Sequence, residues 1–463
     1  MAELLKGGTI VSGQEMKPAD ILVDQGVIVA VGPEVDTAGY PDLMVTDVSG
    51  KLIFPGFIDA HTHFALPVSG TVTADDFESG TKAAISGGTT MIIDFATQYE
   101  GETLDQALDN WFLKAGETCS CDYGFHMAIS DWNEDVSDHL ISMIDRGVTS
   151  FKLYMTYDQM YLEDKVIYQV LKRLNEVGGI TGVHCENKGL IEALISEEKA
   201  AGHLGPDAHP RSRPDLVEAE AIDRLLKIAG LAEAPVIVVH LSTEAGLEEI
   251  CEARENGRQV FVETCPQYLL LDDSLYQLPD FSSGRYVISP PLRGKENREV
   301  LWEAIKEGMI QTVATDHCSF TLAQKDAGRD DFTRIPNGMP GVENRPALIY
   351  TDGVGKGRIT PEQMCRILSE NAAKLYGVYP QKGAIQAGSD ADLVVWDPAV
   401  SWEISVAEQV SRCDYSPFEG YQVKGRAEKV YLRGVLAAEN GKVVQEHQGR
   451  YVARKKWMEP GGY

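Results

Sequence analysis

Apolar positions follow a strand-like pattern at both ends of the chain. Near the N-terminus, short apolar runs at 20–23 and 27–31 flank Asp24-Gln25-Gly26, which is the pattern of two strands joined by a tight turn. Near the C-terminus, Asn440-Gly441 separates two further runs of this kind and predicts a second hairpin. Because the termini of a domain often lie close together, we expect the two ends to form one small β-domain.

The middle of the chain alternates short apolar runs with longer segments of helical periodicity, such as 191–200 and 216–229. Repeated strand–helix units of this kind form parallel sheets, and a closed (β/α)8 barrel is the leading prediction. A doubly wound open sheet is the alternative, but it usually carries a glycine-rich phosphate turn, and no G-x-G-x-x-G occurs here. Strands are expected at 90–94, 150–154, 181–184, 236–240, 260–263 and 312–316.

The predicted fold class is therefore α/β, a TIM-like (β/α)8 barrel with a small β-domain built from both chain ends. We expect the first part of the β-domain at residues 1–52 and the barrel at 53–381. Residues 382–463 are expected to form the second part of the β-domain and a C-terminal tail.

Composition and charge limit the classes of partner. The 463 residues are 43% hydrophobic and 24% charged, as in globular proteins with a sizeable core. The net charge of −28 repels nucleic acid and anionic membranes, so we expect neither as a partner. No apolar run approaches the roughly 20 residues of a membrane helix, and the N-terminal segment lacks a signal-peptide pattern. The eight cysteines are scattered, which predicts reduced thiols in a cytoplasmic protein.

Ionisable side chains stand at or near the carboxyl ends of the predicted strands. Each one alone has an ordinary structural interpretation, such as a hydrogen-bonded histidine or, for Asp316, a helix N-cap. The chain has ten histidines, and four of them stand at such positions, which is harder to explain in this way. The carboxyl ends of barrel strands converge on the face that carries catalysis, so these side chains are predicted to meet there. They are His61, His63, Lys152, His184, His240 and Asp316.

His61 and His63 have the spacing of neighbours on one side of a strand. Residues i and i+2 of a strand point the same way, so both imidazoles can reach one ion. Neutral imidazole is a ligand for zinc and related divalent metals, and Asp316 can add a carboxylate. His184 and His240 can serve a second ion.

Lys152 lies within the apolar run at 151–154 and is predicted to be buried, which is rare for a lysine without a partner. Burial lowers the pKa of an amine, and a neutral amine can react with carbon dioxide to give an anionic carbamate. Such a group can bridge two metal ions. One alternative is a lysine whose stem is buried while its amine reaches solvent at the rim of the barrel, and another is a Schiff-base nucleophile. The four histidines favour the carbamate.

Five segments occur in the order GFIDAHTHF, FKLYMTY, VHCEN, VVHLS and ATDHCSF, and SPPLRG and IPNGMPGVENR add to them. Together they resemble the cyclic amidohydrolases, and within them the dihydropyrimidinase/hydantoinase family, above all bacterial phenylhydantoinases. The resemblance covers essentially the whole chain, and it implies that the small domain built from both chain ends is a β-sandwich beside the barrel.

The resemblance implies two zinc ions in each subunit of a homotetramer. His61, His63 and Asp316 match the ligands of the first ion, and His184 and His240 match those of the second. Lys152 matches the N6-carboxylysine that bridges both ions. Asp316 and Tyr157 are the implied catalytic residues, and the implied substrate-binding residues are Tyr157, Ser289 and Asn337.

The implied function is hydrolytic opening of 5-monosubstituted hydantoins and dihydropyrimidines to N-carbamoyl amino acids. Ala65 stands where dihydroorotases of this superfamily carry an arginine, which disfavours a ring with a carboxylate. Residues 64–73, with Tyr154 and Tyr161, are expected at the mouth of the site. The alternatives are a dihydropyrimidinase acting mainly on dihydrouracil or dihydrothymine, an allantoinase-like hydrolase and a non-catalytic scaffold, although scaffold relatives lose metal ligands that this chain keeps.

Overall fold

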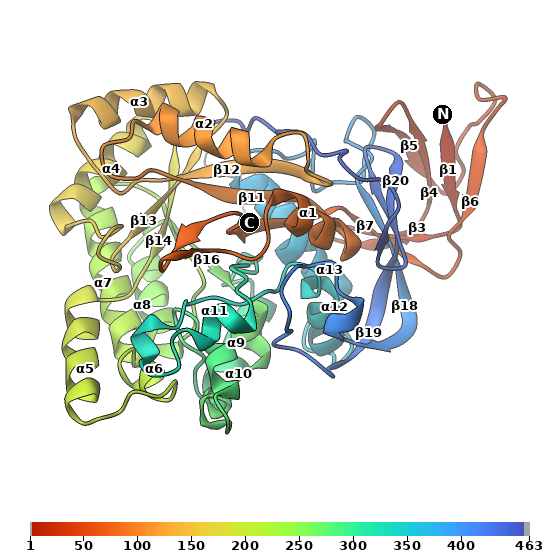
Figure 1. Ribbon diagram of the computed structural model, residues 1–463. Coiled ribbons are helices and arrows are strands. Elements are labelled where there is room, and N and C mark those ends of the chain that lie inside the picture. Colours follow the sequence, from red (N-terminus) through yellow and green to blue (C-terminus); the bar gives the residue numbers. More distant parts are fainter. Residues whose placement is uncertain (1, 458–463) are drawn as a thin grey trace.

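Eight parallel strands form a barrel in the computed structural model, which describes residues 2–457 (Figure 1). The barrel closes just beyond β17, where the backbone N–H of His63 donates to the carbonyl of His317 at 2.8 Å. The predicted fold class is confirmed. The strands are β8 (Phe57–Thr62), β11 (Thr89–Thr97), β12 (Asp122–Ala128), β13 (Ser150–Tyr154), β14 (Ile180–His184), β15 (Val236–Val238), β16 (Val260–Thr264) and β17 (Thr312–Val313).

Helices cover the outside of the barrel, and each one buries a single apolar face. In α4, for example, Ile167, Val170, Leu171 and Leu174 are buried at helical spacing. The predicted helices at 191–200 and 216–229 lie within α5 and α7. The longer helices are α1 (Phe77–Ser86), α2 (Leu104–Ala115), α3 (Glu134–Asp145), α4 (Asp164–Val177), α5 (Lys188–Ala200), α7 (Asp215–Ala232), α8 (Glu244–Glu255) and α10 (Lys295–Lys306).

Shorter helical elements lie in the loops and after the last barrel strand. The α-helices are α6 (Ala208–Arg211), α9 (Pro266–Leu270), α11 (Leu322–Asp326), α12 (Arg345–Ile349), α13 (Pro361–Cys365) and α14 (Asn371–Leu375). Two π-helices, η4 (Tyr350–Val354) and η5 (Arg366–Glu370), connect some of them. The 3₁₀ turns are η1 (Asp273–Gln277), η2 (Ser282–Tyr286), η3 (Phe332–Arg334) and η6 (Val406–Glu408).

Strands from both chain ends pair in one seven-stranded sheet at the right of Figure 1, in the order β21-β20-β19-β18-β7-β2-β3. Its strands are β2 (Thr9–Val11), β3 (Met16–Pro18), β7 (Leu52–Pro55), β18 (Leu393–Glu403), β19 (Gln422–Leu432), β20 (Val435–Glu439) and β21 (Lys442–Val443). A four-stranded sheet of the N-terminal segment lies beside it, with β1 (Glu3–Lys6), β4 (Asp20–Asp24), β5 (Val27–Gly32) and β6 (Met44–Asp47).

Both predicted hairpins occur, as the antiparallel pairs β4–β5 and β20–β21. The boundaries at 52/53 and 381/382 remain a proposal, because β7 crosses the first of them and pairs with β18. Residues 1 and 458–463 of the predicted end segments lie outside the described residues. The tail before them returns to the barrel, where Tyr123 near the start of β12 donates its N–H to the Arg450 carbonyl at 3.0 Å.

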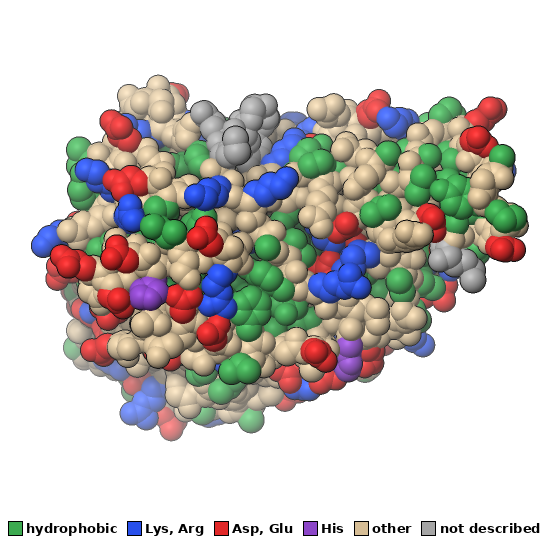
Figure 2. Space-filling view, turned by 90° about the horizontal axis from the view of Figure 1, so that it is seen from above, with side chains coloured by type: hydrophobic (Ala, Val, Ile, Leu, Met, Phe, Trp, Pro, Cys, Tyr) green, Lys and Arg blue, Asp and Glu red, His purple; other side chains and the backbone are tan. Residues whose placement is uncertain are grey.

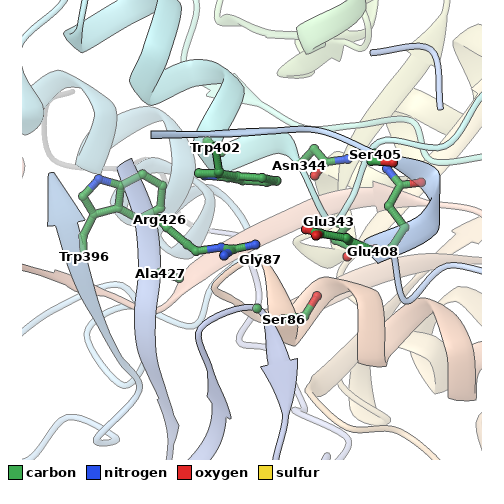
Figure 3. A pocket seen from close by; sticks show the side chains of 13 residues that line it. Ser86, Gly87, Glu343, Asn344, Trp396, Trp402, Ser405, Glu408, Arg426 and Ala427 are labelled. Atoms are coloured by element: carbon green, nitrogen blue, oxygen red, sulfur yellow. The ribbon is translucent and has the colours of Figure 1, made fainter. Parts of the chain in front are cut away.

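The surface carries charges of both signs. On the face with α2 and α3, acidic and basic side chains are interspersed around a central group of apolar ones (Figure 2). Among residues 2–457, none of the helices combines the length and the apolar character needed to cross a membrane. A pocket lies where the barrel meets the seven-stranded sheet, with the Arg426 guanidinium 4.4 Å from the centre of the Trp402 ring (Figure 3). No histidine is among its described lining residues, so the predicted metal site lies elsewhere.

Candidate metal centre and substrate site

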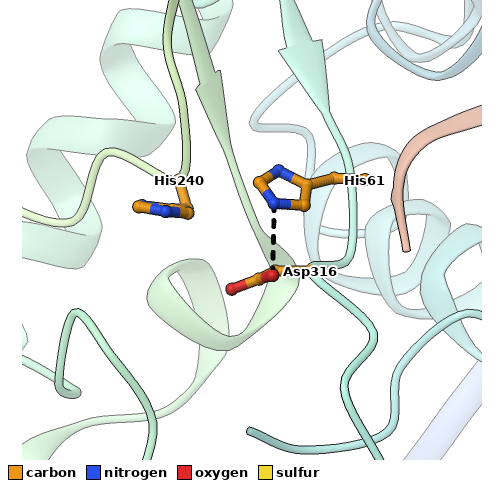
Figure 4. A group of neighbouring side chains, drawn as sticks. All are labelled: His61, His240 and Asp316. Carbon is orange, nitrogen blue, oxygen red and sulfur yellow. Dashed lines mark ion pairs between the residues drawn. The ribbon is translucent and has the colours of Figure 1, made fainter. Parts of the chain in front are cut away.

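The six predicted metal ligands all lie at the carboxyl ends of barrel strands. Three of them, His61, His240 and Asp316, bring ligand-capable atoms within 4.8 Å of one another (Figure 4). Each of the six is one of the last three residues of its strand or one of the three residues that follow it. They are His61 and His63 at β8, Lys152 at β13, His184 at β14, His240 at β15 and Asp316 at β17.

Asp316 faces both histidines of the first pair. Its Oδ1 lies 3.2 Å from Nε2 of His61 and 3.0 Å from Nε2 of His63. Behind His61, Nδ1 lies 2.6 Å from Oε1 of Glu263, so the ring donates its proton there. Burial, with Lys152 and neighbouring histidines, holds the pKa of His61 well below its ordinary value, so the ring is neutral.

This arrangement fits a metal ion. The Nε2 lone pair of neutral His61 and a carboxylate oxygen of Asp316 are both acceptors, and a cation between them satisfies both. The carboxylate behind the imidazole is the usual support of a metal-bound histidine. Burial raises the pKa of Glu263 well above its ordinary value despite Lys152, and a cation at His61 favours the ionised carboxylate.

The second pair of histidines fits an ion in the same way. The rings of His184 and His240 lie 4.6 Å apart. Nε2 of His184 lies 2.7 Å from Oε2 of Glu186, which leaves Nδ1 free. Nδ1 of His240 is buried and has no hydrogen-bond partner among the described residues. His240 and Asp316 also adopt positive φ values, 43° and 52°, a strained conformation that is concentrated at functional sites.

Lys152 is 1% exposed, as its apolar sequence context predicts. Its amine makes neither a hydrogen bond nor an ion pair with the residues that the structure describes, and it lies 5.2 Å from the ring centres of Phe95 and Tyr154. Burial lowers the pKa of Lys152 to about 8, although Asp316 and Glu263 oppose the shift. The amine is therefore partly neutral near pH 7 and open to electrophiles.

The predicted substrate residues lie beside the histidines. The Tyr157 ring lies 5.2 Å from that of His184, and the residue has a φ of 67°. Burial raises its pKa above the usual range, so the hydroxyl stays a donor at neutral pH. Asn337 Nδ2 donates to the Ser289 hydroxyl at 2.9 Å, which joins the two segments that carry them.

Residues 64–73, the expected mouth loop, form a two-stranded hairpin of β9 (Pro67–Val68) and β10 (Thr71–Val72), and Ala65 near its start has a φ of 49°. The two tyrosines expected nearby, Tyr154 and Tyr161, pair with each other through their backbones. The Tyr154 ring stacks beside that of His184 at 6.0 Å. Tyr154 therefore adjoins the second histidine pair.

Sequence reasoning missed the residues behind the ligands. Glu186 also accepts a hydrogen bond at 2.7 Å from buried Arg213, whose guanidinium lies 5.8 Å from the Tyr157 ring centre. Asp59 accepts from the hydroxyl of Thr315 at 2.7 Å and from its N–H at 3.1 Å, which ties β8 to the segment that carries Asp316. Asp59 and Glu186 lie inside segments that the resemblance had singled out, but Glu263 and Arg213 carry no such signal.

Comparison with known proteins agrees with this geometry. The amidohydrolase family model matches residues 52–444. A D-hydantoinase of Geobacillus stearothermophilus is 43% identical, and the match covers 99% of this chain and 97% of the relative. A D-phenylhydantoinase of Escherichia coli is 40% identical over 99% of this chain and 100% of the relative. The crystal structure of dihydropyrimidinase from Brevibacillus agri NCHU1002 superposes with a TM-score of 0.97 at 42% identity, covering 99% of this chain and 100% of the other. The chain therefore belongs to the amidohydrolase family and, within it, to the hydantoinase/dihydropyrimidinase group of cyclic amidohydrolases.

Proposed function

We propose that this enzyme is a two-zinc hydrolase that opens 5-monosubstituted hydantoins and dihydropyrimidines to N-carbamoyl amino acids. The observation that carries the proposal is the convergence of four buried imidazoles and Asp316 beside an unpaired buried lysine. The names of the similar proteins, D-hydantoinase, D-phenylhydantoinase and dihydropyrimidinase, support the same reaction class.

The proposed ligands of one ion are His61, His63 and Asp316, and those of the other are His184 and His240. Lys152 joins them as a carbamate: its neutral amine attacks carbon dioxide, loses a proton and becomes an N6-carboxylysine with two anionic oxygens. This change replaces a buried cation with an anion, which favours binding of two cations nearby. When bound, the two ions supply Lewis acidity, which activates water and polarises an amide carbonyl.

The protein residues divide the remaining steps of the reaction. Asp316 takes one proton from the attacking water and delivers it to the ring nitrogen as the C–N bond breaks and the new C–O bond remains. Tyr157 donates a hydrogen bond to the carbonyl oxygen, whose negative charge grows during the attack. The backbone groups of Ser289 and Asn337 hold the amide edge of the ring.

We propose aromatic or apolar hydantoins as the better substrates, because Tyr154 lies beside His184, Tyr161 pairs with Tyr154, and the β9–β10 hairpin follows His63 in the chain. Values of kcat/KM for phenylhydantoin, dihydrouracil and allantoin test this order. A clear preference for dihydrouracil supports a dihydropyrimidinase, and a preference for allantoin supports an allantoinase-like hydrolase. By family likeness we also propose that the enzyme is a cytoplasmic homotetramer. Light scattering, which measures the mass of the assembly, tests the tetramer.

Replacing Lys152 with alanine tests the metal bridge. We expect Lys152→Ala to lose bound zinc and nearly all activity, because the bridging anion is gone. Short carboxylic acids are expected to restore part of both, since a carboxylate can occupy the same position. Zinc per chain is measured by elemental analysis, with about two expected in the wild type.

Two results contradict the proposal. Full activity with two zinc ions in Lys152→Ala excludes the carbamate bridge. A wild-type protein without zinc that stays inactive after zinc addition supports the non-catalytic scaffold instead.

A further inference from the structure

A second buried lysine, Lys325, contacts both segments that carry the proposed amide-binding residues. It lies in α11, is 1% exposed and follows the proposed metal ligand Asp316 by nine positions. Its amine donates to the carbonyl oxygen of Val287 at 2.8 Å and to that of Pro336 at 2.7 Å. Val287 stands two residues before Ser289, and Pro336 directly precedes Asn337.

No carboxylate accompanies this buried amine among the residues that the structure describes, and burial lowers the pKa of Lys325 to about 7. A buried amine without a counter-ion is costly, and an apolar side chain of similar size would fill the same space at less cost. What the amine adds is two directed hydrogen bonds to backbone carbonyls.

The two segments that Lys325 joins form one unit. The Gly338 N–H donates to the same Val287 carbonyl at 3.1 Å, and Asn337 donates to the Ser289 hydroxyl at 2.9 Å. The unit also adjoins the catalytic strand end, because the N–H of Cys318 donates to Met339 at 3.2 Å. Lys325 therefore holds, at Val287 and Pro336, the two segments that carry the proposed substrate residues.

We propose that Lys325 is a positioning residue for the cyclic amide: it fixes the peptide groups around Ser289 and Asn337 in the orientation that binds the ring. The inference rests on the proposed function, since these peptide groups matter only if they hold the substrate. Binding to a preorganised pair of peptide groups avoids the cost of ordering them. The effect therefore belongs to substrate binding rather than to metal binding or proton transfer.

The experiment compares Lys325→Met with the wild type in the zinc-loaded enzyme. We expect KM for phenylhydantoin and for dihydrouracil to rise about tenfold together, as for the loss of hydrogen bonds worth about 1.4 kcal/mol. We expect kcat to stay within about threefold and zinc per chain to stay unchanged, since no ligand is touched. Lys325→Arg keeps the donors and is expected to recover part of the KM loss, and it serves as the second variant if Lys325→Met does not fold.

Arg254→Met is the matched control. Arg254 also donates to two backbone carbonyls, those of Val260 and Met309, but at the amino ends of the strands. The Arg254→Met variant is expected to have a lower melting temperature and an unchanged KM. An unchanged KM in Lys325→Met, or an equal KM rise in Arg254→Met, overturns the inference while the proposed function stands. A zinc-loaded wild type that hydrolyses no cyclic amide overturns both.

Discussion

The nitrogen that His61 and His184 each turn towards the site depends on a carboxylate behind the ring. Glu263 engages Nδ1 of His61 at 2.6 Å and Glu186 engages Nε2 of His184 at 2.7 Å. The two rings thus expose opposite nitrogens, Nε2 for His61 and Nδ1 for His184. This difference is set by residues that no ligand pattern includes.

Replacing Glu263 with glutamine tests this support. We expect Glu263→Gln to bind zinc about tenfold more weakly, because a neutral amide orients the imidazole and raises its basicity less than a carboxylate does. Zinc affinity is measured by competition with a chromogenic chelator. Glu370→Gln is the control, since Glu370 is also buried but accepts from the N–H of Gly13 outside the site. Equal zinc affinity in the two variants would contradict the role of Glu263.

At the level of single residues, the chain pattern predicted which side chains meet but not how they are oriented. His61 and Glu263 are 202 positions apart, so their contact follows from barrel closure and not from any local spacing. His126 shows the same limit. It is a buried histidine of β12 whose Nε2 lies 2.9 Å from the Ala60 carbonyl and whose Nδ1 lies 2.6 Å from the Ser150 hydroxyl. Both nitrogens have partners, so only the structure separates it from the ligands.

At the level of elements, the six apolar runs expected as strands each overlap a barrel strand, namely β11 and β13 to β17, but β12 was missed. Asp122 and His126 interrupt its apolar character, and both are buried with partners that lie far away in the sequence. The expected strands at 236–240 and 312–316 end early, at Val238 and Val313. Their last expected residues, His240 and Asp316, leave the extended conformation with positive φ values. Hydrophobic patterning does not report such a turn of the backbone.

The short helix α11 makes a second contact that bears on substrate choice. Gln324, beside Lys325, donates through Nε2 to the Thr71 hydroxyl and to the Val72 carbonyl, both at 2.7 Å. These residues form β10 of the mouth hairpin. Gln324 also completes the capping box of α11 by accepting the N–H of Thr321. The helix thus joins the hairpin to the amide-binding segments.

Gln324→Glu removes the two donated hydrogen bonds and keeps the cap, because a glutamate can accept the same N–H. We expect kcat/KM for phenylhydantoin to fall about tenfold, as for two lost hydrogen bonds worth about 1.4 kcal/mol together, with little change for dihydrouracil. The reason is that the hairpin is proposed to contact the exocyclic substituent and not the ring.

Gln363→Glu supplies the matched control for this prediction. Gln363 has the same capping role at α13 and donates to the Lys306 carbonyl at 2.7 Å, away from the mouth. It is expected to leave both substrates unchanged. An equal loss for the two substrates in Gln324→Glu would show that the hairpin does not act on the substituent.

At the level of the whole molecule, one buried cluster joins the barrel to the end sheets. Lys382 is 2% exposed and lies 2.5 Å from Asp122 of β12, 2.9 Å from Asp390 and 2.6 Å from Asp392, which precedes β18. Burial alone would lower the pKa of Lys382, but the three carboxylates outweigh it and raise the pKa above the usual range. This raised pKa means that the stabilising contribution is complete below about pH 10.4, the pKa of lysine in unfolded chains, and is lost only at higher pH.

Lys382→Met is expected to lower the free energy of unfolding by about 3–5 kcal/mol at pH 7, because it removes the buried cation that faces Asp122, Asp390 and Asp392. The loss is expected to be smaller at pH 5, since the carboxylates that remain relieve their repulsion by taking up protons. Urea midpoints at both pH values measure it. Lys227→Met is the control: Lys227 pairs with Asp223 on the exposed side of α7, where solvent screens the pair and its contribution to stability is small. If the two variants lose equal stability, or if the loss in Lys382→Met grows in acid, the cluster does not hold the two parts of the molecule together in this way.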